Sequence, residues 1–266
     1  MNSVKMYGRF LKVYFKQQME FRFSFFGDIV VNMLTYITLF LSLWVLFLKF
    51  PDIKGWGYYE TLFLYNLNLL SYAISSMFLW APMKQLEEMI RKGEFDGFLV
   101  RPIPALKLLV LRQFQHTFIG HIIVSVYILI LCYIKLNLHW SVSQIIYLIA
   151  ALLGATLIHA GIIIIAASTA FWIVKSGVIL NVAIYGVRNY INYPISIYGN
   201  GLKFFLTFIV PYAFVNFYPS EALLGLTTEG TNMALMYGTP CVGILLFAMS
   251  LKIFQMGIRK YESSGS

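Results

Sequence analysis

The chain contains apolar runs that are too long for the core helices of a soluble domain. Residues 145–173, for example, form a continuous stretch without a single Asp, Glu, Lys or Arg. About 18 or more apolar residues in a row predict a helix that crosses a membrane. The strands of a membrane barrel would instead alternate between apolar and polar residues over about 10 positions. We therefore predict an all-α, polytopic membrane protein.

The low content of charge supports the same class. Only 12% of the 266 residues are charged, whereas a soluble domain averages roughly 25%. A surface with so little charge is poorly suited to water. We predict a single domain over residues 1–266 with six spans, at 27–48, 58–80, 107–134, 143–173, 202–217 and 233–256.

A charged passage, residues 81–106, separates the second predicted span from the third. Pro82 predicts the end of the second span, because proline disrupts a helix interior. Residues 83–92 then predict a short polar helix, which Gly93 and Gly97 are expected to break. The charged side chains of this helix are Lys84, Glu87, Glu88, Arg91 and Lys92.

The end of this passage predicts a stiff, extended connector. In Arg101-Pro102-Ile103-Pro104, each proline fixes its own φ and disfavours helix at the residue before it. Such a connector would hold the polar helix at a fixed distance from the third span.

Two other segments have distinct patterns. Residues 1–24 mix Lys and Arg with aromatic side chains, which predicts an amphipathic helix on the inner membrane surface. Residues 175–201 hold several Asn and an Arg, and we interpret them as an interfacial or cytoplasmic segment.

The fifth predicted span is short and contains Pro211, which predicts a broken helix. A broken helix at membrane depth is tolerated where protein or a cavity covers it. A re-entrant segment is favoured over a simply kinked helix, because Pro219-Ser220-Glu221 suits the start of a new short helix with Ser220 as its cap.

The distribution of Lys and Arg predicts the orientation. Six spans place both termini on the same side, and with that side inward 17 of the 20 Lys and Arg residues are inside. The three outside are Lys49, Lys54 and Lys135. Cytoplasmic loops collect positive charge, so we expect cytoplasmic termini and a cytoplasmic charged passage. The net charge of +9 is explained in this way and does not indicate nucleic acid.

The sequence has no GxxxxGK[ST] loop for ATP phosphates and no HExxH, GxSxG or Cys/His metal cluster. We therefore predict no catalytic residue, no metal site and no cofactor bound by this chain. His159, deep in the fourth span, is interpreted as a packed histidine, and Asp28 as an interfacial cap. Small residues of the fourth span predict close helix packing: Gly154, Ala155, Gly161, Ala166 and Ala170.

The charged passage also carries a family signature. GEFDGFLVRPIPAL at 93–106 resembles the G-x-x-D-x-x-L-x-R-P motif of a bacterial permease family, and the passage 192–225 and the final YESSGS are similar to it as well. Together with six spans and a broken fifth span, the chain resembles the membrane subunit of a type-2 ABC exporter from end to end.

The resemblance implies a division of labour. A separate cytosolic ATPase subunit, in two copies, would bind ATP and Mg. A second permease subunit, identical or homologous, would complete the path. Together they would export an amphipathic or hydrophobic cargo (a peptide, lipid or drug) across the bacterial plasma membrane.

The resemblance also implies roles for individual residues. The helix 83–92 would be the coupling helix that docks on the ATPase, through Lys84, Glu87, Glu88, Arg91 and Lys92. Gly93, Asp96, Arg101 and Pro102 would shape the connector. The elements after the fifth span, with Pro211, Pro219 and Glu221, would close the outer end of the path.

Two other classes stay open. A secondary transporter or channel would be expected to show broken helices in paired repeats, and this chain has one broken span and no repeat. A membrane scaffold or immunity-type protein would lack an ATPase partner altogether. Copurification of a nucleotide-binding subunit discriminates between these alternatives.

Overall fold

A computed structural model describes residues 8, 14, 16, 20–173, 176–227 and 231–261. Five helices in it are long and apolar enough to cross a membrane. They are α2 (Arg22–Lys49), α3 (Tyr58–Arg91), α6 (Phe118–Lys135), α7 (Val142–Ser168) and α12 (Thr239–Lys260). Within the described residues the secondary structure is helical apart from an isolated bridge between Ile53 and Trp56. The predicted all-α, polytopic fold is confirmed. Most of the predicted helix at 1–24 lies outside the described residues.

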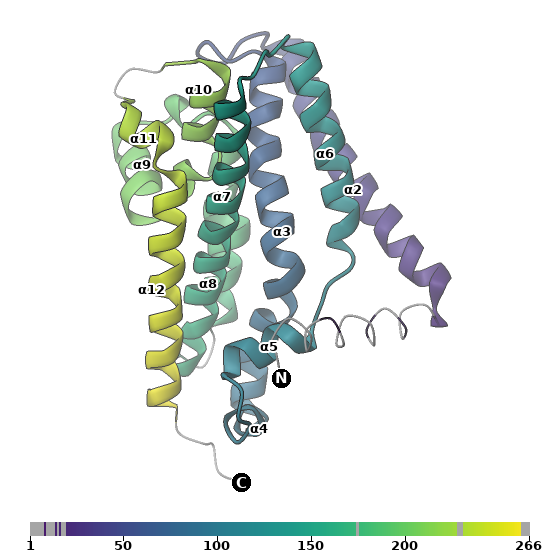
Figure 1. Ribbon diagram of the computed structural model, residues 1–266, viewed down its shortest axis with the longest axis vertical. Helices are drawn as coiled ribbons and strands as arrows, with labels where there is room; N and C mark the ends of the chain where they lie inside the picture. The colour runs from purple at the N-terminus through teal and green to yellow at the C-terminus, as the bar shows by residue number, and fades with distance from the viewer. Residues whose placement is uncertain are drawn as a thin grey trace.

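The five long helices form a bundle with α3 and α7 at its centre (Figure 1). The most apolar window of α3 is 89% buried, whereas those of α2 and α12 are 17% and 22% buried. The outward faces of the peripheral helices carry Val, Leu, Ile and Met side chains. Such faces suit lipid, because the bilayer core is as apolar as these side chains.

Helix α3 continues through Pro82, so the prediction that the second span ends there was wrong. Pro82 has no N–H to give to the Phe78 carbonyl, and it lies buried inside the helix. The adjacent Met77 carbonyl accepts a backbone hydrogen bond from Gln115 at 3.0 Å. Burial of Pro82 in the bundle offsets the cost of an internal proline. The predicted polar helix is therefore the last three turns of α3 and not a separate element.

The third predicted span is also divided. Helix α5 (Ala105–Arg112) ends at an extended residue, Gln113, and α6 begins only at Phe118. The Gln113 side chain donates to the side-chain amide oxygen of Gln85 on α3 at 2.6 Å. Because the polar residues of this linker bond to α3, the helix does not continue through them.

The fifth crossing is formed by residues that we expected to be interfacial or cytoplasmic. A helical run follows α7 and its short extension η1 (Thr169–Phe171). It consists of α8 (Gly177–Asn181), η2 (Val182–Gly186), η3 (Val187–Asn192) and η4 (Ile195–Ile197). The Gly177 amide donates to Glu87 at one end of α3, and Asn192 accepts from Asn68 nearer the other end. Glu87 and Asn68 are 19 residues apart, about 28 Å along a helix, which approaches the roughly 30 Å of a bilayer core.

The predicted break at Pro211 is confirmed. The pair Asn200–Ile209 and Tyr212–Leu224 is bent by 78° at this point. Helix α9 (Asn200–Phe204) and η5 (Phe205–Ile209) lead into the bundle, and η6 (Tyr212–Phe214) and α10 (Phe217–Leu224) lead back. Helix α10 begins at Phe217, so the predicted start at Pro219 and the capping role of Ser220 were wrong. A short helix, α11 (Met233–Tyr237), precedes α12.

Both ends of this bent pair lie at the same end of the bundle. Lys54, between α2 and α3, donates to the Ser196 carbonyl just before α9, and Trp140, between α6 and α7, donates to the Leu223 carbonyl. The turn reaches inward, where the Tyr212 hydroxyl donates to the Ala183 carbonyl at 3.1 Å. The segment therefore has the geometry of a re-entrant hairpin.

The structure corrects the prediction that Arg188 and Lys203 lie on the inner side of the membrane. Arg188, at 8% exposure, lies inside the bundle, and Lys203 lies on α9 within the hairpin that enters from the Lys54 end. The hydropathy of the chain could not separate these positions from a polar loop.

Candidate functional site

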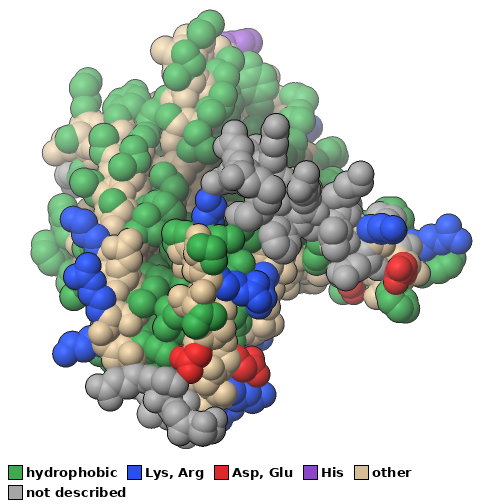
Figure 2. Space-filling view, turned by 60° about the horizontal axis from the view of Figure 1, so that its bottom comes forward, with side chains coloured by type: hydrophobic (Ala, Val, Ile, Leu, Met, Phe, Trp, Pro, Cys, Tyr) green, Lys and Arg blue, Asp and Glu red, His purple; other side chains and the backbone are tan. Residues whose placement is uncertain are grey.

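The end of the bundle that holds α4 (Asp96–Leu99) and α5 carries a concentration of charge, here called the polar end and defined as residues 84–112. Figure 2 shows acidic and basic side chains gathered there. Lys84, Glu88, Arg91 and Lys92 are all exposed. Glu88 and Lys92 form an ion pair at 2.7 Å with about half of each side chain exposed. Such an exposed pair contributes little to stability because water screens it, so both charges stay available to a partner.

Glu87 has a different environment from its neighbours. Its Oε2 atom accepts from the Gly177 amide at 2.5 Å and from the Ser176 hydroxyl at 3.2 Å. A carboxylate at the first residues of a helix satisfies backbone N–H groups that have no intrahelical partner. Glu87 therefore joins the end of α3 to the start of the fifth crossing.

Replacing this carboxylate tests the connection. In Glu87→Gln, the amide oxygen can still accept from Gly177, but the bond is no longer charge-assisted. We expect the amides of residues 177–180 to exchange hydrogen about tenfold faster, because a bond worth roughly 1.5–3 kcal/mol is replaced by a neutral one worth roughly 0.5–1.5 kcal/mol. Glu94→Gln, at an exposed position in the same loop, is the matched control. Equal exchange in the two variants would show that Glu87 does not hold α8.

Gly93 ends α3 as predicted, with φ at +72°, a conformation that glycine adopts without steric cost. The chain then places Phe95, fully buried, against Phe171 and Tyr261, with ring centroids 5.3 Å away in both cases. Phe171 follows α7 and Tyr261 follows α12, so the loop is anchored to two more crossings. The sequence analysis missed this aromatic anchor, although two Phe in GEFDGF were a visible signal.

The rest of the connector is only partly as expected. Gly97 lies inside α4 and does not break a helix. Asp96 begins α4. Burial, followed by the negative charge of Asp96, raises the pKa of Tyr261. Arg101 and Pro102 are exposed. The Arg112 guanidinium lies 4.8 Å from the centroid of the Phe98 ring, a cation–π distance.

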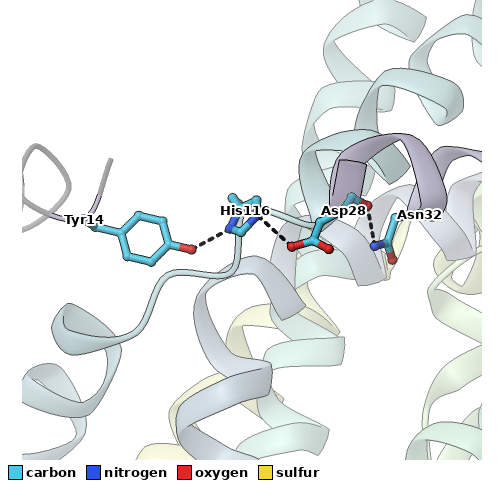
Figure 3. Close-up of polar contacts among 4 residues, drawn as sticks. All are labelled: Tyr14, Asp28, Asn32 and His116. Atoms are coloured by element: carbon cyan, nitrogen blue, oxygen red, sulfur yellow. Dashed lines mark hydrogen bonds and ion pairs between the residues drawn. The ribbon is translucent and has the colours of Figure 1, made fainter. Parts of the chain in front are cut away.

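A second polar contact connects the N-terminal segment to the bundle (Figure 3). The Tyr14 hydroxyl and His116 Nδ1 are 2.7 Å apart, and His116 Nε2 lies 3.6 Å from Asp28 Oδ2. Asn32 donates to the Asp28 carbonyl, one helical turn back. Asp28 therefore contacts the linker before α6. The prediction that it caps the helix was wrong, because α2 begins earlier, with Phe21 as its N-cap.

Acid is expected to lower the stability of the folded chain through His116. Burial lowers the pKa of His116 below its usual 6.5, against the opposing effect of Asp28. The unfolded chain therefore binds a proton at a higher pH than the folded chain, and stability falls as pH drops below about 6.5. We expect the unfolding temperature of His116→Asn to fall less between pH 7 and pH 5 than that of the wild type. An equal fall in the two proteins would contradict this account.

The residues predicted for the outer end lie in the re-entrant hairpin. Pro211 is at the turn, Pro219 is in the first turn of α10, and Glu221 is fully buried. Asn216, also fully buried, donates to the carbonyls of Leu64 and Ile191. These bonds fix the hairpin to α3 and to the fifth crossing. They lie at the opposite end of α3 from the polar end, so the predicted site residues form two separate groups.

Between the two groups lies Arg188, which sequence reasoning placed in a cytoplasmic segment. Its guanidinium is 3.8 Å from the centroid of the Tyr72 ring, near the middle of α3. His159, fully buried, packs against Tyr72 and Tyr212 as predicted for a core histidine. Among the described residues, no three His, Cys, Asp or Glu side chains gather closely enough to hold a metal ion.

Comparisons with known proteins agree with this architecture. No curated protein and no solved structure matches the chain. The family model described as "ABC-2 family transporter protein" matches residues 33–265, which include the five long helices except the first turns of α2, the polar end and the hairpin. Over nearly its whole length, the chain therefore belongs to the ABC-2 family of transporter proteins, whose members are membrane permease subunits that work with an ABC ATPase.

Proposed function

We propose that this chain is the permease of an ATP-driven exporter and that its polar end receives the force produced by the ATPase. Two copies of the ATPase subunit, holding ATP and Mg, would dock on the exposed Lys84, Glu88, Arg91 and Lys92. The sequence supports this division, because it contains no phosphate-binding loop of its own.

The observation that carries the proposal is how the polar end is connected. The first part of the polar end is the continuation of α3. Glu87 connects it to the start of α8, and Phe95 connects it to Tyr261, which follows α12. A displacement of the polar end would thus move the second, fifth and sixth crossings together. Well-packed elements transmit displacement because protein interiors are close-packed.

Two features support an amphipathic or hydrophobic cargo. A cavity of about 750 Å³ lies between α2, α3 and α6, with a lining that includes Phe40, Trp44 and Leu62. This volume is in the range of small-molecule sites. In addition, the fifth crossing exposes polar side chains at helical spacing, namely Asn181, Tyr185 and Asn189. Lipid disfavours such a face, so we assign it to the path or to a second permease subunit, identical or homologous.

The re-entrant hairpin is proposed to close the outer end of the path, with Pro211 at its turn and Pro219 and Glu221 in its returning arm. Its contacts with Lys54 and Trp140 lie at the end opposite the polar end. With the polar end and both termini in the cytoplasm of a bacterial cell, the hairpin would face outward across the plasma membrane. The basic residues at the polar end favour that orientation.

Purification of the tagged full-length chain in mild detergent tests the proposal. We expect a nucleotide-binding subunit, identified by mass spectrometry through its phosphate-binding loop, to copurify in equal amount, and the complex to hydrolyse ATP. A chain that purifies without such a subunit would instead support the scaffold or secondary-transporter alternatives.

A further inference from the structure

Arg188 is a buried cation in the middle of the bundle. Its side chain is 8% exposed, and it lies over Tyr72, which is 14 residues from one end of α3 and 19 from the other. Ionisable groups at membrane depth are costly and usually functional. This position therefore needs a physical explanation.

The side chains that respond electrostatically to Arg188 are aromatic rings. Six side chains lie within electrostatic reach of its guanidinium. They come from α2, α3, α6, α7 and the hairpin, and they are Tyr36, Tyr65, Tyr72, His121, His159 and Tyr212. None of them is an anion near neutral pH. In the part of the chain that the structure describes, neither of the two ion pairs includes Arg188.

Two of its three donor nitrogens also lack a hydrogen-bond acceptor within the described part of the chain. The Nε and Nη1 atoms are buried, and no oxygen or nitrogen atom of the described residues accepts a hydrogen bond from them. The Tyr72 ring attracts the positive charge from the face of the guanidinium. It cannot accept the N–H groups, which lie in the guanidinium plane and form a fork suited to two oxygens of a carboxylate or phosphate.

Exposed residues of the fifth crossing flank Arg188 in the sequence. Asn189 and Tyr190, the next two residues, are exposed, as is Tyr185, one turn earlier. We place the entry of a ligand to the buried donors beside these residues.

We infer that Arg188 binds the oxyanion head group of an amphipathic ligand, a carboxylate or a phosphate, inside the membrane. The Tyr and His rings around it would surround the head group, and the apolar chain would extend toward the lipid. This inference rests on the proposed transport function for its biological meaning. It deepens that proposal by naming an anionic amphiphile as the cargo class.

Binding of four amphiphiles with the same chain length tests the inference without an ATPase subunit. The full-length chain is placed in nanodiscs of zwitterionic lipid, and labelled dodecyl phosphate is displaced by dodecanoate, dodecanol or dodecyltrimethylammonium. Empty nanodiscs give the background. We expect dodecyl phosphate and dodecanoate to bind at least tenfold more tightly than dodecanol, with the ammonium compound weakest.

Variants test whether Arg188 causes the preference for anionic compounds. Arg188→Gln should remove the advantage of the two anions, Arg188→Lys should keep part of it, and Lys135→Gln, an exposed cation at the end of α6, should bind like the wild type. Should Arg188→Gln fail to fold, the order of affinities of the four compounds for the wild type still tests whether the site prefers anions.

Three results would overturn the inference. Equal binding of the four compounds would remove the charge preference, and an anion preference that survives in Arg188→Gln would place the site elsewhere. Displacement of dodecyl phosphate by inorganic phosphate at the same concentration would show a site for free oxyanions. Because no nucleotide is involved, failure here would leave the ATPase proposal standing, and loss of ATPase copurification would leave this binding result standing.

Discussion

Loss of the ATPase subunit is the expected result of reversing three exposed charges at the polar end, in the variant Glu88→Lys, Arg91→Glu and Lys92→Glu. All three side chains are exposed, and placing like charges opposite each other at an interface costs several kcal/mol. We therefore expect at least a tenfold loss of copurified ATPase. Glu87 is left intact, because its carboxylate holds the start of α8.

The fold should tolerate this variant. Two new acidic residues at the end of α3 oppose the helix dipole, but that effect is only about 0.3–1 kcal/mol for each charge. The variant also keeps an ion pair between positions 88 and 92, with the two charges exchanged. Lys135→Glu changes the net charge by the same amount at the opposite end of the bundle and should copurify normally. If the triple variant retains as much ATPase as Lys135→Glu, the polar end is not the docking surface.

A leucine at Gly154 is expected to separate α7 from α12 and to lower the unfolding temperature by about 5–10 °C. A Cβ atom at Gly154 would lie 2.7 Å from the Thr239 carbonyl oxygen and 2.8 Å from Pro240 Cα. These are backbone atoms, which cannot move aside as a flexible side chain can. Overpacking costs about 1–3 kcal/mol and occasionally more, and each kcal/mol corresponds to about 2–4 °C in a chain of this size.

The effect should also reach the re-entrant hairpin, because the Thr239 hydroxyl donates to the Phe214 carbonyl at 2.7 Å. Gly27→Leu is the control, since nothing lies within 4 Å of a Cβ atom at that exposed position on α2. It should unfold at the wild-type temperature or slightly above, given the better helix propensity of leucine. Similar unfolding temperatures for the two variants would contradict close packing at Gly154.

The sequence predicted those parts of the fold that depend on local properties. Long apolar runs gave the all-α membrane class, and the small residue Gly154 indicated tight packing. The turn at Pro211 followed from the fixed φ of proline, and the end of α3 at Gly93 followed from the access of glycine to positive φ. The charged side chains of the polar end were also visible as a departure from apolar composition.

The predictions that failed depend on contacts between segments that are far apart in the sequence. Pro82 was expected to end a helix, but the buried α3 continues past it while Gln115 occupies a neighbouring carbonyl. Glu87 was predicted to face a partner, but the start of α8 uses its carboxylate. Neither outcome can be obtained from the local sequence, because each depends on a residue that lies far away along the chain.

The sequence by itself determined a helical membrane protein with a charged end and a broken segment, because composition and backbone restriction act locally. The permease family was indicated by the resemblance of its motifs. Only the tertiary structure decided that the polar residues 177–192 form a crossing, with Asn192 bonded to Asn68 and Arg188 buried among rings. Polar groups lower the hydropathy of a segment wherever it lies. Whether they face water or the interior depends on partners that other helices supply.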